Sequence, residues 1–252
     1  KQHKLGTLFA VPDRDGKYKE DIKRVKEAAD YPIIVTMDAE WGYGKYKIGN
    51  QMALGYINDL DATYKYARAV GAAARADGFN AICGPILDPA GLNITCPTRT
   101  FMLDKDGIVK QAAAFIKGFH DSGILAITKH YPSTGTTADT HLFEDESNYS
   151  KEELLSNYIY IYTELDKMGL LDGIMTSHRM LSKIDANNPV TVSKPGIDLL
   201  RDKGFDGIAI TDDLDMMGIR ARYGDKRFAQ AIYAGNDIAL EWTGVLAQKS
   251  IY

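Results

Sequence analysis

Cysteine is scarce in this chain of 252 residues, with Cys83 and Cys96 as the only two. Their spacing matches no metal-binding motif, and two cysteines without such spacing more often stay reduced than form a disulfide framework. Apolar residues make up 45% of the chain and charged residues 25%, which is ordinary for a globular protein. The composition therefore predicts a core that is stabilised by packing and not by cross-links.

An excess of positive charge and long apolar runs are absent as well. The net charge of −4 and the pI near 5.8 provide no basic surface, so neither nucleic acid nor anionic lipid is an expected partner. No apolar run approaches the roughly 18 residues of a membrane span, and the first residues, KQHKLGTLFAV, do not resemble a signal peptide. We expect a soluble chain without a membrane span.

The first residue is lysine rather than methionine, so a leader could have been removed before this sequence was written down. The sequence leaves the compartment open between cytoplasmic, periplasmic and secreted. It leaves the oligomeric state open as well.

Short apolar runs rich in β-branched residues recur along the chain, and a polar turn and a stretch of helical periodicity separate each from the next. A strand followed by a helix, repeated, predicts parallel βα units. Seven such runs are readable: Leu8 to Val11, Ile33 to Met37, Ala81 to Leu87, Ile124 to Thr128, Gly173 to Thr176, Gly207 to Thr211 and Asp237 to Leu240.

A doubly wound open sheet and a closed (β/α)8 barrel share this alternation. Polar residues favour the barrel, because the C-terminal ends of barrel strands converge on one face and an open sheet spreads them along a line. No glycine-rich dinucleotide fingerprint follows the first run. The polar groups at the run ends are Asp38 and Glu40, Asp88, Lys129 and His130, His178, and Asp212 and Asp213.

We therefore predict an α/β fold of the (β/α)8 TIM-barrel type. The barrel is expected to be irregular or incomplete, because the eighth strand is either cryptic or outside the chain. No linker or low-complexity tract interrupts the pattern, so residues 1–252 are expected to form a single barrel domain.

Asp212 and Asp213 follow a buried strand in the segment GFDGIAITDDLDM. A carboxylate at that point is well placed to act as a nucleophile, whereas a single aspartate after a strand more often caps the next helix. With two adjacent aspartates both interpretations can hold. Successive strand residues point to opposite sides, so Asp212 is expected to face the pocket and Asp213 the surrounding shell.

The stretch KHYPSTGTTADTH, from Lys129 to His141, contains most of the remaining chemistry. Lys129 and His130 end a buried run, where polar side chains need partners or a cavity. A lone histidine there would more often be structural, but a Lys-His pair favours the binding of hydroxyls or anions. Further along, Asp139 and His141 form an Asp-x-His, in which the carboxylate can hold the imidazole in one tautomer.

Asp38 closes the strand of IIVTMDAEWG, and Trp41 follows in the loop. Trp41 can provide a flat face for a sugar ring or be an ordinary packed aromatic residue. Arg99, in the loop segment PTRTF, can bind substrate or lie in solvent.

These segments together resemble glycoside hydrolase family 3, in its short single-domain branch of β-N-acetylhexosaminidases. The segments that carry the resemblance occur in the family's order: PIIVTMDAEWG, FNAICGPILD, TRTF, the KHYP loop with its Asp-x-His, and GFDGIAITDDLDM. The chain departs from the usual pattern in the loop, where Ser133 and Thr134 replace a Gly-His pair, and after Asp38, where Glu40 and Trp41 precede a glycine.

The resemblance implies a retaining mechanism, with exo-acting release of terminal N-acetylglucosamine. It implies that Asp212 attacks the anomeric carbon and that His141, paired with Asp139, acts as general acid and then as general base. It also assigns the binding of the sugar hydroxyls to four further residues: Asp38, Arg99, Lys129 and His130.

Alternatives remain at this point. A family 3 β-glucosidase or a glycoside phosphorylase would use the same pocket, and a sugar-binding barrel without activity belongs to a different class. A metal-dependent hydrolase fits less well, because the chain has five histidines and no His-x-His after an early strand. We expect a carbohydrate substrate, no cofactor and no metal.

Overall fold

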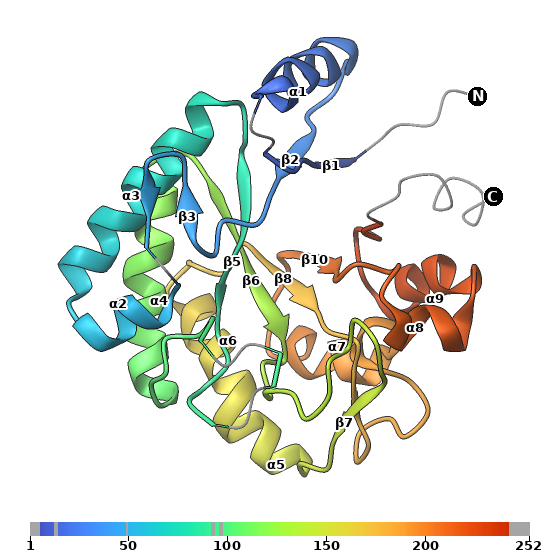
Figure 1. Ribbon diagram of the computed structural model, residues 1–252. Helices are drawn as coiled ribbons and strands as arrows, with labels where there is room; N and C mark the ends of the chain where they lie inside the picture. The colour runs from blue at the N-terminus through green and yellow to red at the C-terminus, as the bar shows by residue number, and fades with distance from the viewer. Residues whose placement is uncertain (1–5, 13–14, 49, 92–93, 96–97, 242–252) are drawn as a thin grey trace.

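The computed structural model describes residues 6–12, 15–48, 50–91, 94–95 and 98–241. Six of the seven apolar runs form parallel strands in sequence order (Figure 1). These strands are β1 (Thr7–Phe9), β2 (Ile34–Thr36), β5 (Ala81–Ile86), β6 (Leu125–Tyr131), β8 (Gly173–Thr176) and β10 (Ile208–Thr211).

Two further contacts extend this order. A parallel bridge between Asp38 and Cys83 joins the end of β2 to β5. The seventh run forms no full strand, but a parallel bridge from Ile238 to Ile210 places it beside β10. Neighbouring segments in space are therefore also neighbours in sequence, as parallel βα units require.

The sheet curls around a shared interior, which is the property that separates a barrel from an open sheet. Side chains from the middle strands, including Cys83, Ile127 and Met175, form one apolar cluster. Phe9 of β1 and Leu240 of the seventh run, at the two ends of the sheet, both pack against this cluster. In the described part of the chain no strand pair closes the circle. The fold is thus an irregular barrel of the α/β class, as predicted.

Helices follow the strands and cover the outside of the sheet. In Figure 1, α3 and α4 lie on one side of β5 and β6, and α8 and α9 on the other side of the molecule. The main helices are α1 (Lys17–Ala28), α3 (Leu60–Ala76), α4 (Lys105–His120), α6 (Ile159–Lys167), α7 (Lys194–Arg201) and α9 (Lys226–Ala234). Side chains of Asp59, Asp104 and Ser193 accept hydrogen bonds from the first turns of α3, α4 and α7, which supports these starting points.

Several shorter elements complete the fold. They are β3 (Gly42–Tyr43), β4 (Tyr46–Lys47), α2 (Met52–Ile57), β7 (Asp145–Ser147), α5 (Lys151–Glu153), a π-helical turn (Leu154–Tyr158), β9 (Arg179–Leu181), a 3-10 turn (Val190–Val192) and α8 (Met217–Tyr223). β7 pairs with β9 in parallel, outside the barrel sheet.

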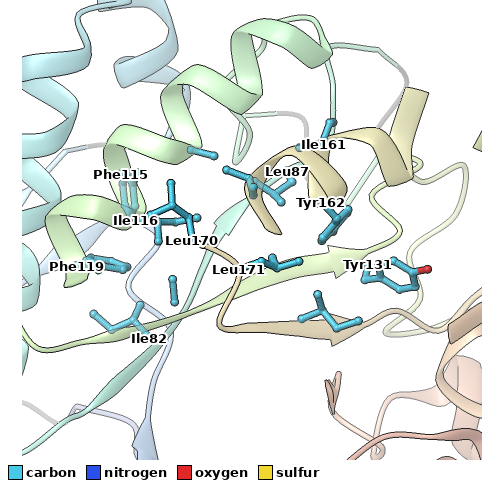
Figure 2. Packing of buried hydrophobic residues seen from close by; sticks show 14 of the residues in the cluster. Ile82, Leu87, Phe115, Ile116, Phe119, Tyr131, Ile161, Tyr162, Leu170 and Leu171 are labelled. Atoms are coloured by element: carbon cyan, nitrogen blue, oxygen red, sulfur yellow. The ribbon is translucent and has the colours of Figure 1, made fainter. Parts of the chain in front are cut away.

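The largest apolar cluster fills the space between the sheet and the helices (Figure 2). Phe115 and Phe119 of α4 pack edge to face with ring centroids 4.8 Å apart, and Tyr131 of β6 packs in the same way on Tyr162 of α6 at 5.1 Å. This layer fixes β6, whose last residues carry polar side chains. No helix among the described residues is both long and apolar enough to cross a membrane.

Candidate active site

A cavity of about 290 Å³ opens at the C-terminal ends of the strands. Its lining includes six of the seven predicted site residues, and the seventh, Asp139, contacts His141 at its edge. The six are Asp38, Arg99, Lys129, His130, His141 and Asp212. The lining as a whole draws residues from the ends of β1, β2, β5, β6, β8 and β10, as the barrel prediction required.

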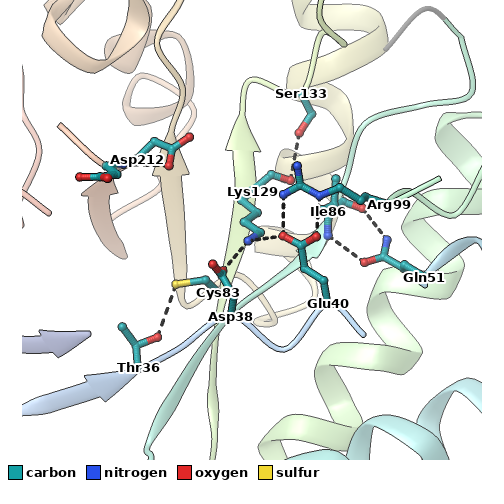
Figure 3. A network of polar contacts seen from close by, with 11 residues as sticks. Thr36, Asp38, Glu40, Gln51, Cys83, Ile86, Arg99, Lys129, Ser133 and Asp212 are labelled. Carbon is teal, nitrogen blue, oxygen red and sulfur yellow. Dashed lines mark hydrogen bonds and ion pairs between the residues drawn. The ribbon is translucent and has the colours of Figure 1, made fainter. Parts of the chain in front are cut away.

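Lys129 and Arg99 form a compact cluster of ion pairs with two carboxylates (Figure 3). Nζ of Lys129 lies 2.5 Å from Oδ1 of Asp38 and 2.6 Å from Oε1 of Glu40. The side chain of Lys129 is only 3% exposed. Burial works against its charge, but the two carboxylates outweigh burial and raise the pKa of Lys129. The ammonium group is therefore a fixed charge at the base of the pocket.

Glu40 connects the two cations of this cluster. Its carboxylate accepts from Nε and Nη2 of Arg99 at 2.5 and 2.6 Å, in a two-pronged arrangement, and also contacts Lys129. Burial would raise the pKa of Glu40, but Lys129 and Arg99 lower it well below its usual value. Two cations and two carboxylates balance in charge, so the cluster can bind neutral hydroxyl groups without a net charge of its own.

The sequence reasoning placed Glu40 at a strand end but assigned it no role. The available signal was its spacing of two from Asp38, which brings two carboxylates to neighbouring places after one strand. Its partners, Arg99 and Lys129, lie 59 and 89 residues further along the chain, so that spacing could not identify them.

His130 lines the cavity next to Lys129. Burial lowers the pKa of His130 to about 3, so the imidazole is neutral at physiological pH. A neutral imidazole has one donor and one acceptor, which suits recognition of a hydroxyl group.

Asp212 lies directly after β10 and lines the cavity, to one side of the Lys129 cluster (Figure 3). Burial works against its ionisation, but the imidazoles of His130 and His178, the backbone N–H of Asp213 and the Lys129 ammonium together lower the pKa of Asp212. The N–H of Asp213 donates to Oδ1 at 2.8 Å. Asp212 is therefore an ionised carboxylate in a fixed orientation, as a nucleophile must be.

Asp213 differs from the expectation in two ways. It also lines the cavity, so it does not face only the outer shell. It does not cap the next helix, because α8 begins at Met217 and the side chain of Asp213 instead accepts from the N–H of Asp215 at 3.0 Å. The chain turns between β10 and α8, so the alternating side-chain directions of the strand do not continue to Asp213.

His178 stabilises this turn through a hydrogen bond to its main chain. Its Nε2 donates to the backbone carbonyl of Asp213 at 2.8 Å, and Nδ1 lies 2.8 Å from Oγ1 of Thr191. Burial lowers the pKa of His178. The side chain thus binds the main chain beside Asp212 and does not line the pocket.

Asp139 and His141 form the predicted dyad. Oδ1 of Asp139 accepts from Nδ1 of His141 at 2.7 Å and from its backbone N–H at 3.0 Å. These bonds lower the pKa of Asp139. Because Nδ1 is used by the carboxylate, Nε2 is the atom left for proton transfer in the cavity. The imidazole is 59% exposed, so the dyad lies at the mouth of the pocket.

The loop that leads to the dyad is closely bound to the barrel. Oγ of Ser133 lies 2.7 Å from the hydroxyl of Tyr162, and the N–H of Gly135 donates to Asp88 at 3.0 Å. On the far side, the N–H of Met217 donates to the carbonyl of His141. Ser133 therefore fits its place through a hydrogen bond that a glycine would lack.

Two other expectations concern residues outside the pocket. Trp41 is 54% exposed and is not among the residues that line the cavity, so the structure gives no support to its role as a sugar platform here. Cys83 is a buried free thiol, and Cys96 lies outside the described residues. Among the residues that are described, no group of three or more His, Cys, Asp or Glu side chains is arranged to hold a metal ion.

The pocket combines an ionised strand-end carboxylate, a carboxylate-imidazole dyad and a cluster of two cations and two carboxylates. Nucleophilic attack at an anomeric carbon with proton transfer to the departing oxygen needs these groups. The fold and the site together define a barrel domain of the class that cleaves glycosidic bonds.

Comparison with known proteins agrees with this class. Residues 4–249 match the model of the glycosyl hydrolase family 3 N terminal domain. A beta-hexosaminidase of Tolumonas auensis is 30% identical over 87% of this chain and 69% of its own length. A beta-N-acetylglucosaminidase/beta-glucosidase of Cellulomonas fimi is 27% identical over 79% of this chain and 38% of its own. The chain belongs to glycosyl hydrolase family 3.

A solved structure confirms the fold. The family 3 beta-N-acetylglucosaminidase from Paenibacillus sp. str. FPU-7 superposes with a TM-score of 0.89 at 24% identity, over 98% of this chain and 51% of that one. The chain thus spans about half the length of that structure and about two thirds of the Tolumonas relative.

Proposed function

We propose that this chain is the catalytic domain of a retaining, exo-acting β-N-acetylhexosaminidase that releases terminal N-acetylglucosamine. The observation that carries the proposal is the meeting of Asp212 and His141 in the lining of one cavity, beside the Lys129 cluster. The name of the Tolumonas relative supports the substrate class. A cavity of about 290 Å³ suits a single terminal sugar better than a polysaccharide chain.

In the proposed first step, the Asp212 carboxylate attacks the anomeric carbon and forms a glycosyl ester. The bond to the leaving oxygen breaks, and Nε2 of His141 gives that oxygen a proton. In the second step His141 takes a proton from water, the water oxygen attacks the anomeric carbon, and Asp212 leaves as a carboxylate. Two inversions give overall retention.

The charged cluster has a separate task in this proposal. Asp38, Arg99, Lys129 and His130 bind the hydroxyl groups of the sugar, and Glu40 keeps the two cations in place through its contacts of 2.5 and 2.6 Å. Since Lys129 and Glu40 are almost fully buried, their geometry is set before the sugar arrives.

The test measures aryl alcohol release from an aryl β-N-acetylglucosaminide and the matching β-glucoside in parallel. We expect the N-acetylglucosaminide to be the better substrate, and Asp212→Asn to abolish turnover because an amide is not a nucleophile of this kind. His141→Ala should slow substrates with poor leaving groups by roughly 100-fold or more, and activated ones far less.

Each alternative function predicts a different result. Faster release from the glucoside would favour a β-glucosidase, the second activity in the name of the Cellulomonas relative. Formation of a sugar phosphate when phosphate is added would identify a phosphorylase. Saturable binding of N-acetylglucosamine by folded protein without any turnover would indicate a sugar-binding barrel.

A further inference from the structure

Asp145 is the first residue of β7, and its side chain binds the loop that carries the dyad. The residue is 3% exposed. Its Oδ1 accepts three hydrogen bonds from the loop: from the N–H of Thr137 at 3.0 Å, from the hydroxyl of Thr137 at 2.6 Å and from the N–H of Ala138 at 3.0 Å. The residue that follows Ala138 is Asp139, the first member of the dyad.

Arg179 binds the other oxygen of the same carboxylate. The residue lies directly opposite Asp145 in the pairing of β7 with β9, and its Nη1 forms an ion pair with Oδ2. The guanidinium also donates to the carbonyl of Gly135 at 2.5 Å and to that of Glu146 at 2.7 Å. Arg179 thus contacts the loop at Gly135, before the segment that Asp145 binds.

The side chains of the dyad are exposed and hydrogen-bond to each other. Their position therefore depends on the loop backbone, which the N–H groups of Met217 and Gly218 also bind, at His141 and Thr140. Asp145 and Arg179 bind that backbone from Gly135 to Ala138. A buried ion pair costs desolvation, and an apolar pair of similar size would often stabilise a fold as well or better. An apolar pair, however, could not accept the loop's N–H groups or donate to its carbonyl.

We propose that Asp145 and Arg179 are positioning residues that place His141 for proton transfer. This inference rests on the proposed function. Neither side chain takes part in bond making; both act through the backbone that precedes Asp139. Loss of either should therefore mimic the loss of His141 and should leave the chemistry of Asp212 intact.

The test compares Asp145→Ala and Arg179→Lys with the unaltered chain on two substrates. Phenyl β-N-acetylglucosaminide needs protonation of its leaving oxygen, and the 2,4-dinitrophenyl glycoside does not. We expect kcat/KM for the phenyl substrate to fall on the order of 100-fold in Asp145→Ala, with a smaller fall in Arg179→Lys, and that for the dinitrophenyl substrate to fall several-fold at most.

Azide supplies a second readout. It attacks the anomeric carbon of the glycosyl-enzyme without a general base, releases the Asp212 carboxylate and yields the β-glycosyl azide. We expect azide to raise kcat on the dinitrophenyl substrate in both variants. A merely structural role would not produce this effect.

Asp172→Asn is the matched control. Asp172 accepts from the N–H of Ala126 at 2.8 Å and pairs with His120 at 2.7 Å, at the opposite end of β6 and β8. Its loss should change both substrates by the same factor, with no azide effect.

Equal losses on both substrates in Asp145→Ala and Arg179→Lys, without azide rescue, would overturn the positioning role. Arg179→Lys keeps a cation opposite Asp145, so it decides the question if Asp145→Ala does not fold. If His141→Ala itself shows no preference for the acidic leaving group, the proposed function fails and this inference falls with it.

Discussion

Asp88 and Asp212 are both carboxylates that line the pocket, yet their surroundings move their pKa values in opposite directions. Burial raises the pKa of Asp88 to about 6, because the N–H of Gly135, the side chain of Ser133 and the more distant arginines do not offset it. The imidazoles of His130 and His178, the N–H of Asp213 and the Lys129 ammonium lower the pKa of Asp212 despite its burial. Environment, rather than residue type, therefore determines which of the two carboxylates is the more readily ionised.

Asp88 should make stability depend on pH. Its pKa is higher in the folded chain, about 6, than in the unfolded chain, about 4, so the folded state binds the proton more tightly. The contribution of Asp88 to the free energy of unfolding should fall as pH rises from about 4 to about 6, by up to ~3 kcal/mol, and stay level outside that window.

Asp88→Asn removes this titration. The stability of the variant relative to the unaltered chain should increase between pH 4 and 6 and then remain constant, as measured by denaturant unfolding from pH 4 to 8. A difference that does not change with pH would show that Asp88 does not titrate in this range.

The sequence located single residues well where a strand end gave them a fixed place. Asp38, Lys129, His130 and Asp212 were found in this way, and all four line the cavity; their roles remain predictions. Glu40, Asp145 and Arg179 received no role, because each depends on partners far away in sequence that only the folded chain brings near.

At the scale of elements, apolar runs and helical periodicity predicted most of the barrel. The stretches of helical periodicity between the apolar runs include α1, α3, α4 and α7. The pair of β7 with β9 could not be predicted, since Asp145–Ser147 is short and polar and is stabilised by the ion pair to Arg179. The π-helical turn between α5 and α6 also leaves no mark in a pattern read at 3.6 residues per turn.

The contact between α3 and α4 gives a prediction for stability. Gly118 of α4 lies so close to α3 that an added Cβ would be 2.5 Å from the carbonyl oxygen of Tyr64 and 2.8 Å from the N–H nitrogen of Arg68. Because both atoms are backbone, Gly118→Ala should force the helices apart and destabilise the chain by about 1–3 kcal/mol.

Thermal unfolding measures this effect, with Lys110→Ala on the exposed face of α4 as control. Alanine is a better helix former than glycine, so without the close approach Gly118→Ala would stabilise α4. If Gly118→Ala unfolded at the same temperature as the unaltered chain or at a higher one, the close approach would be contradicted.

At the scale of the whole molecule, the curled sheet makes the site possible. Phe9 and Leu240, more than 200 residues apart in sequence, pack against one interior cluster, and the same curvature brings the strand ends around one cavity. The polar residues at the ends of the apolar runs predicted this arrangement, because barrel strands bring their C-terminal ends to one face. The weak pairing of the seventh run could not be predicted, because this run joins β10 by a single bridge and no strand pair among the described residues closes the barrel.

The central claim is that Asp212 becomes covalently bound to the sugar. A 5-fluoro N-acetylglucosaminyl fluoride should trap this species, because fluorine slows both steps and the fluoride leaving group keeps the first one accessible. Intact-mass measurement and peptide mapping are predicted to show one fluorosugar on Asp212. A label on another carboxylate, such as Asp88 or Asp213, or no label on protein that turns over substrate, would contradict the account.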